Sequence, residues 1–295
     1  MIFYVLLLLT ACRNGDDPED ILNPGECEPE WSVQLPEEVK ETSGLLVWDD
    51  YILTHNDSED TRLYLLDPVT GDLVRYMNVA GYVNQDWEDV AMDEEYIYLG
   101  DFGNNADGAR TNLVILKISK TSVEAGDPEV EMINFHYEGR KFPDPVPQNN
   151  TDFDCEAMIA KGDSLYLFTK QWTSGQSTVF RLPKDPGEHV ADSLTALKVD
   201  GLITGATSSG SSGRVVLCGY TILLEPFLYV LEDFPGDLNG LQKPEKIRLS
   251  LDFHQLEGID SRDGRFYYLS NEKLQMDPFP ETSQMLHMFD LEKCR

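Results

Sequence analysis

The chain has 295 residues, of which 53 are acidic and 23 are basic, so its formal net charge is −30 at pH 7. This charge repels the phosphate backbone of nucleic acids and anionic lipid headgroups, so we expect no nucleic-acid partner, and it favours cations such as Ca²⁺. The length is enough for a sizeable hydrophobic core in a single domain.

The first residues predict export. Residues 2–11, IFYVLLLLTA, are too short to cross a bilayer as a helix but have the length of a signal-peptide core. They end in Leu9-Thr10-Ala11-Cys12, which resembles the lipobox of bacterial lipoproteins, where the signal is cut before a cysteine that is then lipidated. No Lys or Arg precedes the run, and an ordinary cleaved signal with a stray cysteine is the alternative. We expect a signal peptide at 1–11 and a lipid anchor on Cys12 in the outer membrane of a bacterial cell envelope.

Residues 12–30 combine acidic residues, Pro and Gly without apolar periodicity, which predicts a flexible acidic tether. The single domain is expected at 31–295. It opens with a lone strand at 31–35, WSVQL, which has no hairpin partner of its own.

One pattern then recurs five times: a short apolar strand, a polar turn and a second strand, bracketed by polar residues. In DWEDVAMDEEYIYLGDFGNN, at 86–105, the brackets are Glu88 and Asp101, thirteen positions apart. A strand, a turn and a strand form a β-hairpin, so both brackets should lie at the same end. The other copies are bracketed by Ser43 and Asn56, by Glu156 and Thr169, by Glu257 and Ser270, and, with a longer spacing, by Thr204-Gly205 and Gly219-Tyr220.

Each copy extends to as many as four strands. We predict strands at 44–47, 51–54, 62–66 and 73–79, then from 89 and at 96–100, 113–118 and 130–137, then at 157–160, 164–169, 177–182 and 194–199, then at 205–208, 214–219, 227–231 and 246–251, and finally at 258–260, 265–270 and 286–291. The last copy lacks a fourth strand. The Pro- and Asn-rich segment 138–154 reads as a long functional or capping loop.

Four-stranded units repeated at roughly fifty residues are typical of β-propeller blades. The sequence therefore predicts an all-β, five-bladed β-propeller, in which the strand at 31–35 completes the last blade and closes the ring. A six-bladed ring is the alternative, although 138–154 contains no evident strand pair. A disulfide between Cys27 and Cys294 would fasten the same seam, and Cys155 and Cys218 are expected to be buried small residues.

The first strand of each propeller blade lines the central channel, so the residues that open these strands should meet on the axis. All of them carry a side-chain oxygen: Ser43, Glu88, Glu156, Thr204 and Glu257. Clustered carboxylates repel one another unless a cation lies among them, and Ca²⁺ takes six to eight oxygen ligands. The ring contains no His or Cys, which argues against Zn²⁺ or Cu²⁺. The alternative is that these side chains only accept hydrogen bonds from neighbouring blades.

This order of one Ser, Glu, Glu, Ser/Thr and Glu per blade, with ETSGL at 41–45 and DWEDV at 86–90, resembles the calcium-activated nucleotidase (apyrase) family. The resemblance implies a five-bladed propeller with axial Ca²⁺ that hydrolyses nucleoside di- and triphosphates. The chain also resembles, more loosely, esterase-like and phytase-like exported propellers. The apyrase segment Asp-Asp-Arg-Thr-Gly corresponds here to 56–60, NDSED, which has no arginine.

Residues that end the second strands should form a further polar set at the same mouth of the channel. From these and their neighbours we take as candidate catalytic residues Asp57, Asp101, Arg110, Lys170 and Glu272. Asp57 or Asp101 would be the general base, and Arg110 or Lys170 would receive an anionic leaving group.

Two functions are consistent with these residues. The first is a calcium-dependent hydrolase of a phosphate ester, phosphoanhydride or related ester. The second is a surface lipoprotein that binds a glycan or a protein partner without catalysis, in which Ca²⁺ is structural. In both, a small anionic or sugar-containing ligand would bind at the propeller mouth, the membrane contact would be the lipid anchor alone, and the protein would be a monomer.

Overall fold

The computed structural model describes residues 26–141, 143–208, 213–234 and 244–295. The predicted signal peptide, the lipidated Cys12, most of the tether and most of the Ser/Gly run at 208–213 lie outside the described residues. Within them, no helix is both long enough and apolar enough to cross a membrane.

The first sheet has four antiparallel strands in chain order. They are β3 (Thr42–Trp48), β4 (Tyr51–Asn56), β5 (Arg62–Leu66) and β6 (Leu73–Asn78). A short 3-10 helix, η1 (Glu37–Val39), precedes β3. Every residue of β3 is buried, whereas β6 exposes four of its six residues, so burial falls from the first strand of the sheet to the last.

An eight-stranded sheet follows, and two successive copies of the repeat build it. The first copy gives β7 (Trp87–Met92), β8 (Tyr96–Asp101), β9 (Leu113–Ser119) and β10 (Val130–Tyr137). The second gives β11 (Asp154–Lys161), β12 (Ser164–Lys170), β13 (Ser177–Pro183) and β14 (Gly187–Leu197). The last strands of the two copies, β10 and β14, pair in parallel and join them.

The remaining two sheets contain the chain ends. One is made of β15 (Leu202–Thr207), β16 (Val215–Tyr220), β17 (Pro226–Leu231) and β18 (Glu245–Leu249), with β1 (Glu26–Cys27) parallel to β18. The other is made of β19 (Leu256–Asp260), β20 (Phe266–Asn271), β21 (Met285–Asp290) and β2 (Trp31–Gln34). The prediction that the strand near 31–35 completes the last repeat is confirmed, because β2 pairs antiparallel with β21.

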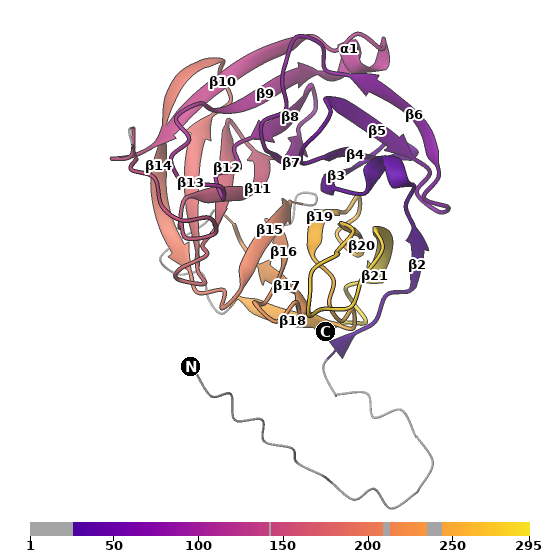
Figure 1. The fold of residues 1–295 in the computed structure, drawn as a ribbon. Helices are drawn as coiled ribbons and strands as arrows, with labels where there is room; N and C mark the ends of the chain where they lie inside the picture. Colours follow the sequence, from indigo (N-terminus) through magenta and orange to yellow (C-terminus); the bar gives the residue numbers. More distant parts are fainter. Residues whose placement is uncertain (1–25, 142, 209–212, 235–243) are drawn as a thin grey trace, which may run out of the picture.

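The sheets are arranged radially (Figure 1). The first strand of each repeat lies innermost, and the described inner strands form a closed series in which β3 contacts β7, β7 contacts β11, β11 contacts β15, β15 contacts β19, and β19 contacts β3. The hydrophobic core lies between neighbouring sheets; for example, Leu53 and Leu65 pack with Trp87 and Leu99 from the next sheet. This arrangement brings the start of every inner strand to one end of the axis.

The structure differs from the predicted elements in three places. The strand predicted at 194–199 begins at Gly187, because its first half pairs with β10 rather than within its own repeat. A short helix, α1 (Lys120–Glu124), and the two-residue strand β1 were not predicted. The loop predicted at 138–154 has no strand among its described residues as far as 153, but its last residue, Asp154, begins β11.

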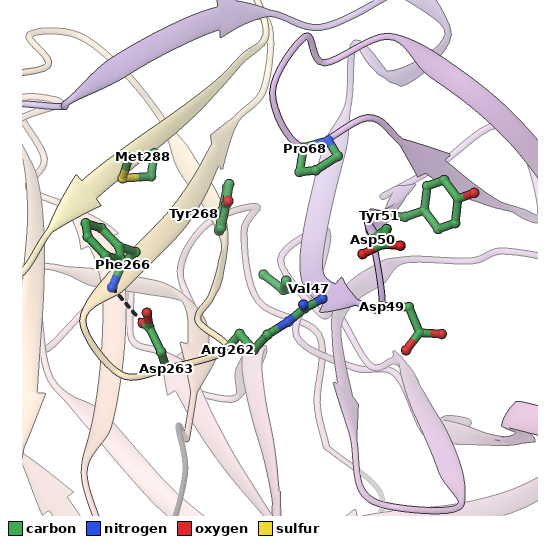
Figure 2. A pocket seen from close by; sticks show the side chains of 10 residues that line it. All are labelled: Val47, Asp49, Asp50, Tyr51, Pro68, Arg262, Asp263, Phe266, Tyr268 and Met288. Atoms are coloured by element: carbon green, nitrogen blue, oxygen red, sulfur yellow. Dashed lines mark hydrogen bonds between the residues drawn. The ribbon is translucent and has the colours of Figure 1, made fainter.

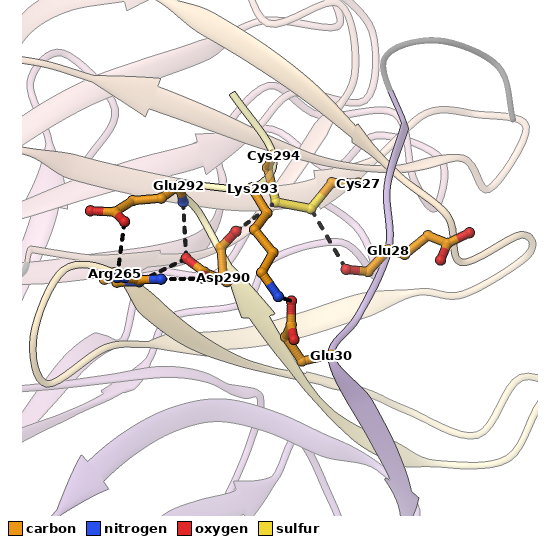
Figure 3. Close-up of a disulfide and its surroundings, with 8 residues drawn as sticks. All are labelled: Cys27, Glu28, Glu30, Arg265, Asp290, Glu292, Lys293 and Cys294. Carbon is orange, nitrogen blue, oxygen red and sulfur yellow. Dashed lines mark hydrogen bonds and ion pairs between the residues drawn. A yellow bond between two sulfur atoms is a disulfide. The ribbon is translucent and has the colours of Figure 1, made fainter.

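A disulfide joins Cys27 to Cys294, as the sequence predicted, and links the strand beside β18 to the end of the chain after β21 (Figure 3). Next to it, Lys293 Nζ lies 2.6 Å from Glu30 Oε1. Cys155 and Cys218 are free and buried.

Candidate metal and catalytic site: an acidic cavity on the axis

The inner strands share a β-bulge near their first residues. The pairing with the second strand passes over Glu88, Glu156, Thr204 and Glu257, and in β3 it passes over Gly44, which follows Ser43. A bulge leaves one residue outside the ladder and redirects its side chain. Each residue that the sequence analysis placed on the axis therefore lies at a bulge or directly before one.

A cavity of about 180 Å³ lies at this end of the axis. It is lined by Glu41, Thr42, Ser43, Asp57, Glu88, Asn105, Gln148, Asn149, Glu156, Lys170, Trp172, Tyr220, Gln255, Glu257 and Glu272. Six of these described residues carry a carboxyl group and one carries an amine. The structure thus brings together four of the five predicted metal ligands and three of the five predicted catalytic residues.

The two hydroxyl residues of the predicted ring make hydrogen bonds between sheets. Ser43 Oγ donates to the backbone oxygen of Glu88, and Thr204 Oγ1 donates to that of Leu256. We expected such side chains, if not bound to metal, to accept hydrogen bonds from the neighbouring backbone; here they donate. Thr204 is not among the described residues that line the cavity.

Two of the carboxyl groups that line the cavity are buried and have no partner among the described residues. Glu88 and Glu257 are only 5% and 7% exposed, no hydrogen bond or ion pair joins their side chains to another described residue, and both line the cavity. One carboxyl oxygen of Asp57, Oδ1, is also buried without a partner. A buried carboxylate without a partner is costly, so this cavity is suited to a bound cation.

Burial changes the proton affinity of these groups. Burial and the nearby carboxylate of Glu156 raise the pKa of Glu88 well above its usual range. Burial raises the pKa of Glu257 to about 7, and burial together with Asp154 raises the pKa of Asp86 to about 7. A positive ion among them would favour their charged forms and lower these pKa values.

Asp154 is a candidate ligand that the sequence analysis missed. Carboxylate oxygens of Glu88, Asp154 and Glu156 lie within 4.8 Å of one another. Ca²⁺ binds oxygens at about 2.3–2.6 Å, so ligands on opposite sides of one ion are about 5 Å apart, and this trio fits around it.

The Asp154 carboxylate is fixed in place by two hydrogen bonds. Its Oδ1 accepts from the backbone N–H of Asn104 at 2.6 Å, and its Oδ2 accepts from Trp172 Nε1 at 2.8 Å. Such outer contacts orient metal ligands.

A sequence signal for Asp154 was available. An acidic residue stands two positions before the ring glutamate in both Asp86-Trp87-Glu88 and Asp154-Cys155-Glu156. Glu41 and Gln255 occupy the same position relative to Ser43 and Glu257, and both line the cavity.

Lys170 lies inside the cavity at the end of β12. Its Nζ is 3.1 Å from Glu156 Oε2, and the side chain is 6% exposed. Burial alone would lower the pKa of Lys170, but the adjacent Glu156 carboxylate raises it well above its usual range. The ammonium group therefore stays charged among the carboxylates.

Asp101 and Arg110 lie beside the cavity rather than in its wall. Arg110 Nη2 is 2.6 Å from Asp101 Oδ1, and Arg110 Nη1 donates to the backbone oxygen of Gly103 at 2.6 Å. Neither residue is among the described residues that line the cavity. These two predicted catalytic residues therefore contact each other, and their contacts hold the loop around Gly103 in place.

The long loop at 138–153 contributes to the wall of the cavity through Gln148 and Asn149. It is held against the preceding repeat, because the backbone N–H groups of Val146 and Asn149 donate to the backbone oxygens of Asp107 and Asn105. This supports the expectation that the loop is a functional or capping excursion.

Gly103 is required for the position of Glu88. A methyl group on Gly103 would collide with the carboxylate oxygens of Glu88 and Asp86. Because these oxygens end flexible side chains, we expect Gly103→Ala to displace Glu88 without unfolding the protein and to weaken cation binding about tenfold or more, as loss of ligand orientation does. Calorimetric titration with CaCl₂ measures the affinity, and an unchanged affinity would show that Glu88 is not a ligand.

A larger cavity, about 430 Å³, lies near the turns between β3 and β4 and between β19 and β20, at the opposite ends of these strands (Figure 2). Its charged groups are Asp49, Asp50, Arg262 and Asp263, all exposed, and Asp263 Oδ1 is already an acceptor for the backbone N–H groups of Arg265 and Phe266. Among the described residues that line it, none is a buried carboxyl group without a partner, as Glu88 is in the acidic cavity. We therefore place the candidate site in the acidic cavity.

No family model and no curated protein sequence matches the chain. The chain is similar in structure to the GH43 endo-arabinanase from Bacillus licheniformis, with a TM-score of 0.52, 10% identity, and coverage of 88% of this chain and 96% of that one. It is also similar to the WD40 repeats of RRP9 (TM-score 0.47, 8% identity, 88% and 97% covered) and to U3-55K (0.49, 9%, 88% and 99%). The similarity to the endo-arabinanase shows the fold, a β-propeller.

Proposed function

We propose that this protein is an exported β-propeller that binds Ca²⁺ in the acidic cavity and uses the site to hydrolyse a phosphate ester, phosphoanhydride or related ester. The observation that carries the proposal is the pair of buried, unpartnered carboxylates of Glu88 and Glu257 in a cavity whose acids outnumber its single amine. Glu88, Asp154, Glu156 and Glu257 would hold the ion. Ser43 and Thr204 would support it indirectly, through the hydrogen bonds that fix Glu88 and the residue before Glu257.

We infer that the ring has five blades. The eight-stranded sheet then counts as two blades that are joined at their outer edges by β10 and β14. The closed series of inner strands from β3 to β19 supports this count. The signal peptide, the lipid anchor on Cys12 and the acidic tether would place the propeller at the bacterial outer membrane as a monomer.

In the proposed reaction, Ca²⁺ would polarise the phosphoryl oxygens and lower the pKa of water. Asp57 would take a proton from water, because burial and the nearby Glu41 carboxylate raise its pKa to about 6, which suits a general base near neutral pH. The Lys170 ammonium would stabilise negative charge on the leaving group. Glu272, which is half-buried and lines the same cavity, would orient the water.

The test is turnover of a panel of phosphate esters and phosphoanhydrides by the full chain with CaCl₂. Because the base must be unprotonated, and because bound Ca²⁺ in the same cavity lowers the pKa of Asp57 below its metal-free value of about 6, kcat/KM should rise with pH below about 6 and be level above it. Asp57→Asn should lower kcat about 100-fold or more and remove this pH dependence, as expected for loss of a general base. The exposed Asp72→Asn, far from the cavity, is the control. Turnover that is equal with chelator, or unaffected by Asp57→Asn, would contradict the proposal.

The second candidate is a binding protein in which Ca²⁺ is structural. It is favoured by the engagement of Arg110 with Asp101 and Gly103, which leaves Lys170 as the cation for an anionic substrate among the described residues that line the cavity. Calcium binding without turnover of any ester in the panel would support this candidate, with a glycan or protein as the ligand.

A further inference from the structure

The Lys170 ammonium group pairs with a carboxylate that a metal ion would need as a ligand. Its Nζ lies 3.1 Å from Glu156 Oε2, and Glu156 belongs to the trio whose oxygens lie within 4.8 Å of one another. Among the described residues that line the cavity, Lys170 is the one with a positive charge. A cation bound to Glu156 must share or displace this ammonium group.

The ammonium is also confined by two aromatic rings. Lys170 Nζ is 4.9 Å from the ring centroid of Trp172 and 5.4 Å from that of Tyr220. Both rings are fixed: Trp172 donates to Asp154, and the Tyr220 hydroxyl accepts from Gln255 Nε2 at 3.0 Å. Cation–π contacts stabilise an ammonium where it is desolvated, so Lys170 is held inside the cavity rather than free to leave it.

A lysine is not what this position carries elsewhere in the repeats. Lys170 pairs with Asp154 in the hairpin register, and the same place is occupied by Asp57 opposite Glu41 and by Glu272 opposite Gln255. The third repeat thus has a tethered cation where the first and fifth have acids.

We propose that Lys170 is a built-in competitor of the metal ion: its ammonium neutralises Glu156 in the metal-free protein and thereby weakens calcium binding to the cavity. This rests on the proposed calcium site. Calcium would have to overcome both the ion pair with Glu156 and the repulsion from an ammonium a few ångströms away. Opposite or like charges at this range change the affinity of a site for a positive charge about tenfold or more.

The experiment compares calcium affinity, by calorimetric titration of chelator-treated full chain with CaCl₂, between wild type and Lys170→Met. Methionine keeps much of the side-chain length and contact with the rings but removes the charge. We expect Lys170→Met to bind Ca²⁺ about tenfold or more tightly. The matched control is Lys184→Met: Lys184 Nζ lies 2.8 Å from Asp93 Oδ2 and 5.5 Å from the Tyr98 ring centroid, outside the cavity, so its loss should leave the affinity unchanged.

The outcomes separate this inference from the proposed function. Calcium binding by Lys170→Met alone, with none by wild type, supports the competitor and refutes a calcium-loaded native protein. Equal or weaker binding by Lys170→Met, or binding by neither chain, overturns the competitor. If Lys170→Met does not fold, the pair Glu156→Gln and Glu156→Gln/Lys170→Met tests the repulsion without the ion pair: the double variant lacks the ammonium and should bind Ca²⁺ more tightly than the single one, and equal or weaker binding by the double variant overturns the competitor.

Discussion

Ca²⁺ is expected to raise the melting temperature of the wild-type protein, and Glu88→Gln is expected to abolish this rise. Glu88 is buried, has no hydrogen-bond or ion-pair partner among the described residues, and lies within the trio that fits one ion. Glutamine has nearly the same size and lacks the charge that a cation needs. In chelator the variant should be at least as stable as the wild type, because a neutral amide is not repelled by the neighbouring carboxylates of Glu156 and Asp86.

The size of the effect follows from linkage. A ligand bound only by the folded state stabilises it by about 2.7 kcal/mol when its concentration is 100 times Kd. In a protein of this size that corresponds to a rise of about 5–10 °C. Thermal melts of the full chain, in chelator and in excess CaCl₂, measure this rise in melting temperature. They compare wild type, Glu88→Gln and the exposed control Glu94→Gln.

Glu88 is a sharper test than Glu156. Removing Glu156 would also strip Lys170 of its partner, and breaking a buried ion pair costs about 3–5 kcal/mol whether or not a metal binds. Glu88 has no such partner, so its substitution reports on the cation alone. If Glu88→Gln and wild type gained equally from calcium, or if neither gained, the cavity would not be a calcium site of this composition.

The axial position of the site was predictable because the thirteen-residue spacing in the repeat follows from the structure of one hairpin. Bracketing residues thirteen apart are what a short hairpin with one bulged residue produces, and the bulge lies at or next to the predicted ring residue in every inner strand. The closing strand β2 was also predictable from the repeat. The strand at 31–35 has no hairpin partner and the last repeat lacks a fourth strand, so pairing the two completes both.

Side-chain partners were not predictable in the same way. Asp101 and Arg110 both lie beside the cavity, but they form a 2.6 Å ion pair with each other instead of lining it. Sequence periodicity does not predict such a pairing. Asp154 was missed because the prediction used only the first residue of each inner strand. The residue two positions earlier reaches the same cluster of carboxylates. The parallel pairing of β10 with β14 joins two repeats, whereas the repeat pattern describes only pairings within one.

Loss of the Cys27–Cys294 disulfide is expected to destabilise the propeller by about 3–5 kcal/mol, because the bridge closes nearly the whole chain. The two cysteines are separated by 267 residues, and the entropy that a cross-link removes from the unfolded chain increases with loop length. In the folded state the chain ends are also held at this seam by the four-residue strand β2, the two-residue strand β1 and the partly exposed ion pair of Lys293 with Glu30 (Figure 3). These contacts are short and partly exposed, so they replace little of the covalent constraint.

The measurement compares melting temperatures of wild type and the double variant Cys27→Ala/Cys294→Ala, each with and without a reductant. For a chain of this size the expected loss corresponds to about 10 °C. Reductant should lower the wild-type melting temperature by a similar amount and leave the double variant unchanged, which separates the covalent link from the packing lost with the two sulfur atoms. Cys155 and Cys218 are free and remain in both proteins, so they cannot produce the difference. A wild-type melting temperature insensitive to reductant, under conditions where thiol titration shows the bridge open, would mean that β2 pairing alone closes the ring.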